Sequence, residues 1–280
     1  MNYPKSTLII SVYKDVDSLD LILESLAKQT ILPNEVIISE DGNSLEMANF
    51  TSEAKEKYQN LNIIHLTQED KGWRKNRALN RAIVEASNEY LIFIDGDCIP
   101  YMGFVEGHLH HSRKNVVLCG KRMELGPILT KKIKDKELSV FDVEKNYIKF
   151  LPKLFKDSSR HIEDGFVLNK NNIIAKVIQK RKVRHILGCN FSLYKENFLE
   201  INGLNEDFIN PAEGEDVDPS WRFEEINIKL KSVRLVANIA HLYHKKIFDH
   251  ETGKINRIIM NKSKQKKQYF TTNGIIKLKD

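Results

Sequence analysis

The sequence predicts an α/β protein whose centre is a mostly parallel, Rossmann-like sheet flanked by helices. Three observations lead to this fold class. Short apolar runs alternate with helical patterns through the first 100 residues, the order that parallel strands with crossover helices require. Hydrophobic residues make up 41% of the 280-residue chain, enough for one large domain or two small ones. Acidic residues directly follow two of the apolar runs, where open α/β sheets bind ligands.

The first half of the chain has the clearest elements. Residues 7–12 form an apolar run typical of a buried strand. Asp15 and Asp17 favour a helix start, and apolar residues then recur at helical spacing up to Leu26. Pro33 ends that unit. We expect further strands at 35–39, 62–66 and 90–94, a polar helix at 47–59 and a helix with one buried face at 73–86.

The second half is less regular. Residues 126–184 are rich in lysine and give no clear strand, so we interpret them as a variable insertion or lid. Asp218 and Pro219 are typical of an N-cap and first helical residue, which predicts a helix reaching about residue 230. We also expect a glycine-broken strand at 185–194, a short helix at 196–201 and a final strand at 232–240. The predicted organisation is therefore 1–125, 126–184, 185–250 and a tail at 251–280.

The basic charge is concentrated in that tail. The formal net charge is +6, and residues 251–280 hold eight Lys or Arg and two acids, which leaves 36 basic and 36 acidic residues elsewhere. Such a tail is solvated, packs on the domain, mediates self-association, or binds an anionic membrane surface or nucleic acid. Nucleic acid is the less favoured partner, because only Tyr269 and Phe270 provide aromatic rings near these lysines.

The sequence gives no sign of export or membrane insertion. Residues 1–6 lead directly into the first strand, and no apolar run approaches the ~18 residues of a membrane span. Cys98, Cys119 and Cys189 form neither a disulfide framework nor a zinc-binding spacing. We therefore expect a cytoplasmic location, with the basic tail as the candidate for peripheral contact with the inner face of the membrane.

The most informative motif is Asp95-Gly96-Asp97, at the end of the strand at 90–94. Two carboxylates at the end of a buried strand are costly unless a cation meets them. Gly96 lets the backbone turn and leaves room for a ligand. We expect Asp95 and Asp97 to face a divalent metal ion, a sugar hydroxyl or both, although Asp-Gly turns without a ligand are also common.

Four sites in this order resemble those of family 2 glycosyltransferases with the GT-A fold. They are Glu40-Asp41, Asp95-Gly96-Asp97, Gly214-Glu215-Asp216, and His241 with His244. The resemblance covers residues 5–245 and is strongest to bacterial members whose C-terminal half is of the galactosyltransferase type. It implies a GT-A fold in which 1–125 bind a nucleotide sugar and 185–250 form the acceptor and catalytic half. Other matching motifs are residues 11–14, 69–74 and 95–100.

This resemblance implies a metal-dependent, inverting transfer. Asp97 would be the direct ligand of Mn²⁺ or Mg²⁺, with Asp95 on the metal or the ribose and His241 completing the site. His244 ranks second as a ligand, because on a strand it would point away from His241. In the Glu215-Asp216 pair, the aspartate would be the general base, and the glutamate would bind acceptor hydroxyls or orient the base.

On the nucleotide side, the resemblance implies contacts to the base from the Glu40-Asp41 pair, with Asp41 as the better match. The helix at 73–86 presents Trp73, Arg77 and Asn80 on one face. The family commonly has an arginine immediately before this asparagine, a place that Leu79 occupies here. Either Arg77 or Arg74 would then supply the cation.

The substrates implied are a UDP-sugar donor and a hydroxyl of a surface polysaccharide or lipid-linked oligosaccharide, with a hexose or N-acetylhexosamine transferred. Two other functions are compatible with parts of the pattern. A nucleotidyltransferase also places acids and a metal beside a nucleotide, but it usually has a glycine-rich basic loop after the first strand, unlike residues 11–15. A nucleic-acid-binding protein acting through its tail would leave the acids at the strand ends unexplained.

Overall fold

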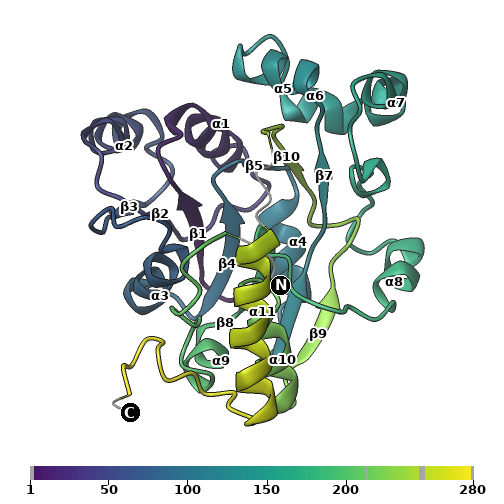
Figure 1. Cartoon of the computed structure of the whole chain (residues 1–280). Coiled ribbons are helices and arrows are strands. Elements are labelled where there is room, and N and C mark those ends of the chain that lie inside the picture. The colour runs from purple at the N-terminus through teal and green to yellow at the C-terminus, as the bar shows by residue number, and fades with distance from the viewer. Residues whose placement is uncertain (1–2, 212–213, 246–249, 279–280) are drawn as a thin grey trace.

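The computed structural model describes residues 3–211, 214–245 and 250–278, and it contains two sheets (Figure 1). The large sheet has the order β3-β2-β1-β4-β8-β6-β9, and the small one has the order β5-β10-β7. The strands of the large sheet are β1 (Ser6–Val12), β2 (Glu35–Glu40), β3 (Ile63–Leu66), β4 (Tyr90–Asp95), β6 (Val116–Cys119), β8 (Asn190–Tyr194) and β9 (Lys229–Ser232). Those of the small sheet are β5 (Cys98–Pro100), β7 (Arg122–Glu124) and β10 (Ile239–His241).

The pairing of the first four strands confirms the predicted fold class. Strands β1 to β4 are parallel, whereas β8 runs antiparallel to β4 and β6. The register places Ser11 of β1 opposite Ser39 of β2 and opposite Asp95 of β4. The acidic residues that follow β2 and β4 therefore come to the same edge of the sheet.

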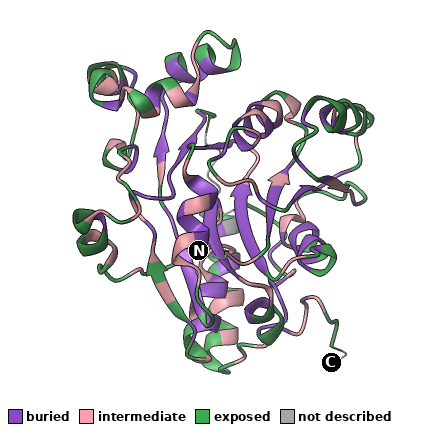
Figure 2. Cartoon of the chain, turned by 180° about the vertical axis from the view of Figure 1, so that it is seen from behind, coloured by how far each residue is buried: buried purple, intermediate pink, exposed green. Residues whose placement is uncertain are grey.

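Helices cover both faces of the large sheet. Because successive residues of a strand face opposite sides, Leu8 and Ile10 contact one hydrophobic layer and Ile9 the other. Figure 2 shows these central strands as buried. The first layer is formed with α1 (Val16–Leu26), α2 (Leu45–Lys57) and α4 (Phe104–His111), and the second with α3 (Lys75–Glu85), α9 (Lys195–Glu200) and α10 (Asp218–Glu225).

The segment 126–184, which gave no clear element in the sequence, is helical. It contains α5 (Pro127–Lys134), α6 (Val140–Lys145), α7 (Tyr147–Lys156), the 3₁₀ helix η1 (Ile162–Asp164) and α8 (Ile173–Gln179). In Figure 1, α5, α6 and α7 lie above the small sheet at the upper right. Lys134 of α5 reaches the cavity described below. The role of this segment as a lid stays a prediction.

Three boundaries predicted in the second half are wrong. The strand at 185–194 is confined to 190–194, because the amides of Ile186 and Gly188 bond to Ser220 Oγ and Asp216 Oδ2 instead of a neighbouring strand. Helix α10 ends at Glu225, and β9 follows it. The strand expected at 232–240 is reduced to β10, since residues 233–238 form turns.

The predicted N-cap of α10 is also wrong. Val217 occupies that position, and Asp218 is the first helical residue. Its buried carboxylate instead accepts hydrogen bonds from Trp221 Nε1 at 2.9 Å and Arg222 Nη1 at 3.1 Å. Arg222 Nε in turn donates to the carbonyl of Tyr269 at 2.8 Å. This buried ion pair therefore connects α10 to the C-terminal segment.

The C-terminal segment packs on the domain, which is one of the alternatives predicted for the tail. Helix α11 (His250–Gln265) buries Asn256. The side-chain Nδ2 of Asn202 donates to the carbonyls of Thr271 at 2.7 Å and Ile276 at 2.8 Å. In Figure 1, α11 runs in front of the large sheet. A free, solvated tail is therefore contradicted for the described residues 250–278.

A buried polar chain fixes the protonation state of His108, which is fully buried in α4. Asn190 Nδ2 donates to two backbone carbonyls, so its Oδ1 accepts a hydrogen bond from His108 Nε2 at 3.0 Å. The other ring nitrogen, Nδ1, lies 2.7 Å from the hydroxyl of Ser192 and accepts its proton. Burial lowers the pKa of His108 from 6.5 to about 3.

We expect this histidine to make folding stability depend on pH. Between pH 6.5 and about 3 the unfolded chain binds a proton on His108 and the folded chain does not. The contribution of His108 to the free energy of unfolding is therefore fully present above pH 6.5. As the pH drops below 6.5, the free energy of unfolding falls by up to about 1.4 kcal/mol per pH unit because of this group. Urea unfolding of the wild type and of His108→Gln from pH 7.5 to 4.5 measures the difference. Parallel pH profiles for the two proteins would contradict the expectation.

Candidate active site

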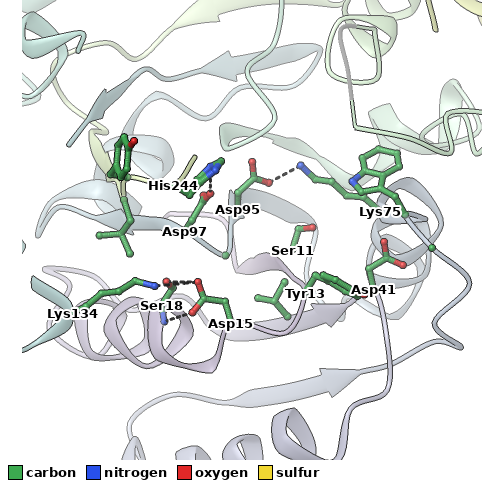
Figure 3. A pocket seen from close by; sticks show the side chains of 16 residues that line it. Ser11, Tyr13, Asp15, Ser18, Asp41, Lys75, Asp95, Asp97, Lys134 and His244 are labelled. Atoms are coloured by element: carbon green, nitrogen blue, oxygen red, sulfur yellow. Dashed lines mark hydrogen bonds and ion pairs between the residues drawn. The ribbon is translucent and has the colours of Figure 1, made fainter. Parts of the chain in front are cut away.

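A cavity of about 560 Å³ lies at the carboxyl edge of the large sheet (Figure 3). Residues from the ends of β1 and β4, the start of α3, helix α5 and the segment after β10 line it. Figure 3 shows Asp41 and Lys75 at one side of the view and Asp97 with His244 at the other. Polar side chains on the lining include Ser11, Asp15, Ser18, Asp41, Lys75, Asp95, Asp97, Lys134 and His244.

Asp97 and His244 line one end of this cavity, and the buried His241, which is not on the lining, contacts Asp97 there. Asp97 Oδ2 lies 3.3 Å from His241 Nε2 and 3.2 Å from His244 Nε2. Strand β10 pairs with β5, which places His241 opposite Cys98 and beside Asp97. The expectation that His244 points away is wrong, because the chain leaves the strand after His241 and the amide of Tyr243 bonds to a hydroxyl of α5.

This group fits a divalent metal ion. Its ligand atoms all lie within 4.8 Å of one another. Two ligands at right angles on bonds of about 2.1 Å are separated by about 3 Å, close to the distances found here. Burial opposes the charge of Asp97, but hydrogen bonds from His241 and His244 outweigh it and hold the pKa of this carboxyl well below its usual range. One carboxylate and two imidazoles leave coordination positions for ligand oxygens.

Asp95 lies against a cation of the protein itself. Its Oδ1 accepts a hydrogen bond from Lys75 Nζ at 2.7 Å, and it is not among the three residues whose ligand atoms converge. The structure thus does not bring the predicted ligand Asp95 into the metal group. Burial disfavours the charged form of Lys75, but the carboxylates of Asp95, Asp216 and Glu215 outweigh it and raise the lysine's pKa well above its ordinary value.

Lys75 was missed by sequence reasoning, and it joins the two acidic motifs. It lies in the first turn of α3, where it is near Asp95 on β4 and the Glu215-Asp216 pair before α10. Asp216 Oδ2 accepts a hydrogen bond from the amide of Gly188 at 3.1 Å. A Cβ at Gly188 would lie 2.2 Å from Asp216 Oδ1, so only glycine permits this close approach. Residues 212–213, ahead of this pair, lie outside the described residues.

At the other end of the cavity, Asp41 is held by two donors. Gln68 Nε2 donates to its Oδ1 at 2.6 Å, and the amide of Arg74 donates to its Oδ2 at 2.7 Å. Tyr13, with 52% of its surface exposed, and the half-buried Trp73 line the same cavity. Two aromatic rings near a carboxylate form a suitable site for a nucleobase. Both rings lie in motifs that carried the resemblance, yet sequence analysis assigned a role to neither.

Glu40 and Asn80, two predicted nucleotide contacts, are outside the cavity lining. Glu40 is 1% exposed, and its carboxylate bonds to the amide of Ser44 and the ring of His65, both at 2.9 Å. The side-chain Nδ2 of Asn80 donates to the carbonyl of Leu204 at 2.8 Å. The structure gives both side chains packing contacts, because they face the interior from β2 and α3.

The guanidinium groups of the two candidate arginines lie outside the first cavity, near Gln68. Arg77 Nη1 donates to Gln68 Oε1 at 3.0 Å, and both Arg77 and Arg74 line a separate cavity of about 580 Å³. Arg74 supplies its backbone amide to Asp41, and its guanidinium does not line the first cavity. Direct contact of either guanidinium with a nucleotide stays a prediction.

Gly96 lies in the turn after β4 and lines the cavity, and a close backbone contact also requires glycine there. Its amide donates to the carbonyl of Ser11 at 2.7 Å, and a Cβ there would lie 2.9 Å from that oxygen and from Val12 Cγ1. Glycine is therefore required for the close approach of the ends of β1 and β4. Its backbone does not adopt a positive φ.

Comparison with known families agrees with this geometry. The sequence profile of glycosyl transferase family 2 matches residues 7–198, which is most of the chain. The chain belongs to this family. A second profile, the N-terminal domain of galactosyltransferase, matches residues 171–245, which include Asp216, His241 and His244. The predicted family and the galactosyltransferase type of its C-terminal half are confirmed. No curated protein sequence is significantly similar to it.

Solved structures confirm the GT-A fold of this glycosyltransferase. A mannosyltransferase from Pyrobaculum calidifontis, in complex with GDP-Man and Mn²⁺, has a TM-score of 0.60 at 13% identity over 95% of this chain. GalNAc-T7 with UDP, GalNAc and Mn²⁺ has a TM-score of 0.65 at 13% sequence identity over 96% of this chain. S. aureus TarS has a TM-score of 0.57 at 14% sequence identity over 92% of this chain. The glycosyltransferase spans 65%, 50% and 39% of these chains, respectively. Among the helices that the structure describes, none has the length and apolar character needed to cross a bilayer.

Proposed function

We propose that this chain is a metal-dependent, inverting glycosyltransferase that uses a UDP-sugar. It would transfer a hexose or N-acetylhexosamine to a hydroxyl of a surface polysaccharide or lipid-linked oligosaccharide. The observation that carries the proposal is one cavity with a nucleobase-type site at Asp41 and a metal-binding group of Asp97, His241 and His244 at its other end. The Mn²⁺ of two similar structures supports this cofactor, and the UDP of GalNAc-T7 supports a UDP-sugar, whereas the mannosyltransferase holds GDP-Man.

The donor's leaving group determines what these residues have to do. Mn²⁺ or Mg²⁺ held by Asp97, His241 and His244 would neutralise the charge that develops on the departing diphosphate. Asp95, fixed by Lys75, presents its remaining lone pairs to the cavity, where a ribose or sugar hydroxyl can donate to them. The half-exposed ring of Tyr13 and the indole of Trp73 would cover the base.

Asp216 is the general base in this proposal. It takes the proton of the acceptor hydroxyl while the hydroxyl oxygen bonds to the anomeric carbon. The bond from that carbon to the diphosphate breaks on the opposite face, so the anomeric configuration inverts. The amide of Gly188 orients the carboxylate, and Glu215 beside it would bind acceptor hydroxyls.

The decisive test is release of UDP. The full chain is incubated with Mn²⁺ and a panel of UDP-sugars, with GDP-mannose for comparison. We expect UDP release from at least one of them, its loss on chelation by EDTA and its return when Mn²⁺ is added back. Full activity of the metal-stripped enzyme would contradict the metal group, and release from no UDP-sugar would contradict the proposed donor.

We also propose a cytoplasmic location with peripheral contact to an anionic membrane surface through Lys262, Lys264, Lys266 and Lys267. These four side chains are exposed at the end of α11 and just beyond it. Deleting the segment would also remove the carbonyl of Tyr269 that accepts a hydrogen bond from Arg222, so substitution of the four lysines by glutamine is the cleaner change. Binding to phosphatidylserine vesicles should fall at least about tenfold. Equal binding by the variant and the wild type would exclude this surface.

A further inference from the structure

A second cavity, of about 850 Å³, lies between α4, α8 and strand β9 at the edge of the large sheet. We call it the basic groove. Seven exposed Lys or Arg side chains line it: Arg113 after α4, four from residues 176–182, and Lys229 and Lys231 of β9. Glu224 is the only acidic residue on the lining. None of the seven forms an ion pair with another described residue, so their charges are available to a ligand.

The basic groove is not a consequence of overall composition. Outside residues 251–280 the chain has 36 basic and 36 acidic residues. Three separate stretches of the chain nevertheless bring their cations to one concave surface, and clustered like charges repel unless an anion binds. The electrostatic repulsion among these clustered cations would be relieved by a polyanionic ligand, which is the kind of ligand that the groove indicates.

The groove extends towards the candidate active site. A cavity of about 230 Å³ shares Arg181, Lys182 and Val183 with it and is also lined by Lys121, Arg184 and His185. The chain then runs from His185 to Gly188, whose amide bonds to Asp216. The basic surface of the two cavities, which we call the basic path, therefore extends along residues 180–185, and Gly188, three residues later, contacts the proposed general base.

We propose that this path binds an anionic glycan, a polymer with phosphate, sulfate or carboxylate groups, and directs one of its hydroxyls to Asp216. This inference rests on the proposed function, because it names the class of acceptor. The lining argues against two other occupants. It has no Phe, Tyr or Trp on which the bases of a single-stranded nucleic acid would stack. Of its aliphatic residues, Leu118 and Ile228 are buried and Val183 and Leu230 are only partly exposed, so the groove presents little apolar surface for insertion into a lipid bilayer.

The test is binding of the full chain to dextran sulfate, with neutral dextran and poly(dT) as comparisons. We expect salt-dependent binding to dextran sulfate only. The triple variant Arg181→Gln, Lys182→Gln, Lys231→Gln should bind at least about tenfold more weakly and lower the slope of log K against log salt by about two. The charge-matched control replaces Lys149, Lys153 and Lys156 of α7, exposed lysines outside the groove, and should change affinity by no more than about threefold.

Three outcomes would overturn the inference. Equal losses in the two variants would show that only total charge matters, and binding of neutral dextran as tight as that of dextran sulfate would exclude anion recognition. Poly(dT) binding that is tighter than dextran sulfate binding and is lost in the same triple variant would assign the groove to nucleic acid.

UDP-sugar hydrolysis without acceptor distinguishes failure of this inference from failure of the proposed function. Its absence in the wild type would count against the proposed function, whereas the dextran sulfate result would still decide the groove.

Discussion

Replacing Asp97 with alanine is expected to lower the rate of sugar transfer by more than about 100-fold. Asp97 Oδ2 is the atom on which the Nε2 atoms of His241 and His244 converge, and it is the only carboxylate oxygen in that group. Its loss removes the anionic ligand of the ion that would neutralise the leaving diphosphate. Two imidazoles alone would hold Mn²⁺ weakly.

The experiment measures turnover at saturating Mn²⁺ and, by calorimetric titration, the affinity for Mn²⁺. Both the turnover and the Mn²⁺ affinity should be lower in Asp97→Ala than in the wild type. A second cluster offers a matched control. His161, Glu163 and Asp164 also bring ligand atoms within 4.8 Å of one another, but both acids pair with Arg234. Glu163→Gln should therefore leave Mn²⁺ affinity and turnover unchanged. Normal Mn²⁺ affinity in Asp97→Ala, or an equal loss in Glu163→Gln, would remove Asp97 from the metal site.

The parts of the fold that the sequence predicted best are buried on both sides. Strands β1, β2 and β4 pack against helices on each face, so they appear as unbroken apolar runs followed by polar residues. Their parallel pairing then brings Asp41 and Asp97 to one edge, which is why the acidic motifs could be assigned to one site. Helix α3 was predicted for the same kind of reason, since it has one clearly apolar face.

What the sequence did not predict depends on contacts between distant segments. Lys75 has no distinguishing local pattern, and its importance comes from Asp95, 20 residues away, and from the still more distant Asp216. His244 joins the metal group because the chain leaves a strand of only three residues, which alternation cannot anticipate. The basic groove is assembled from three stretches that are each an ordinary solvated charge pattern alone.

Asp216→Asn is the second change with a large expected effect. The substitution keeps the shape of the side chain and an oxygen that can accept the Gly188 amide, but an amide cannot take up the acceptor's proton. We expect turnover to fall by at least about 100-fold. The affinity for the UDP-sugar should survive, since neither Asp216 nor Glu215 lines the donor cavity.

The experiment measures turnover and the dissociation constant of the UDP-sugar for Asp216→Asn and, as a matched control, Glu215→Gln. Both variants remove one negative charge near Lys75, which retains Asp95 as its partner at 2.7 Å. If only the lost charge mattered, turnover would fall by a similar factor in the two variants. If Asp216 is the base, the large loss of turnover occurs only in Asp216→Asn. Glu215→Gln should mainly raise the KM for the acceptor, because an amide still hydrogen-bonds to hydroxyls. If Asp216→Asn retains normal turnover and Glu215→Gln does not, Glu215 is the base.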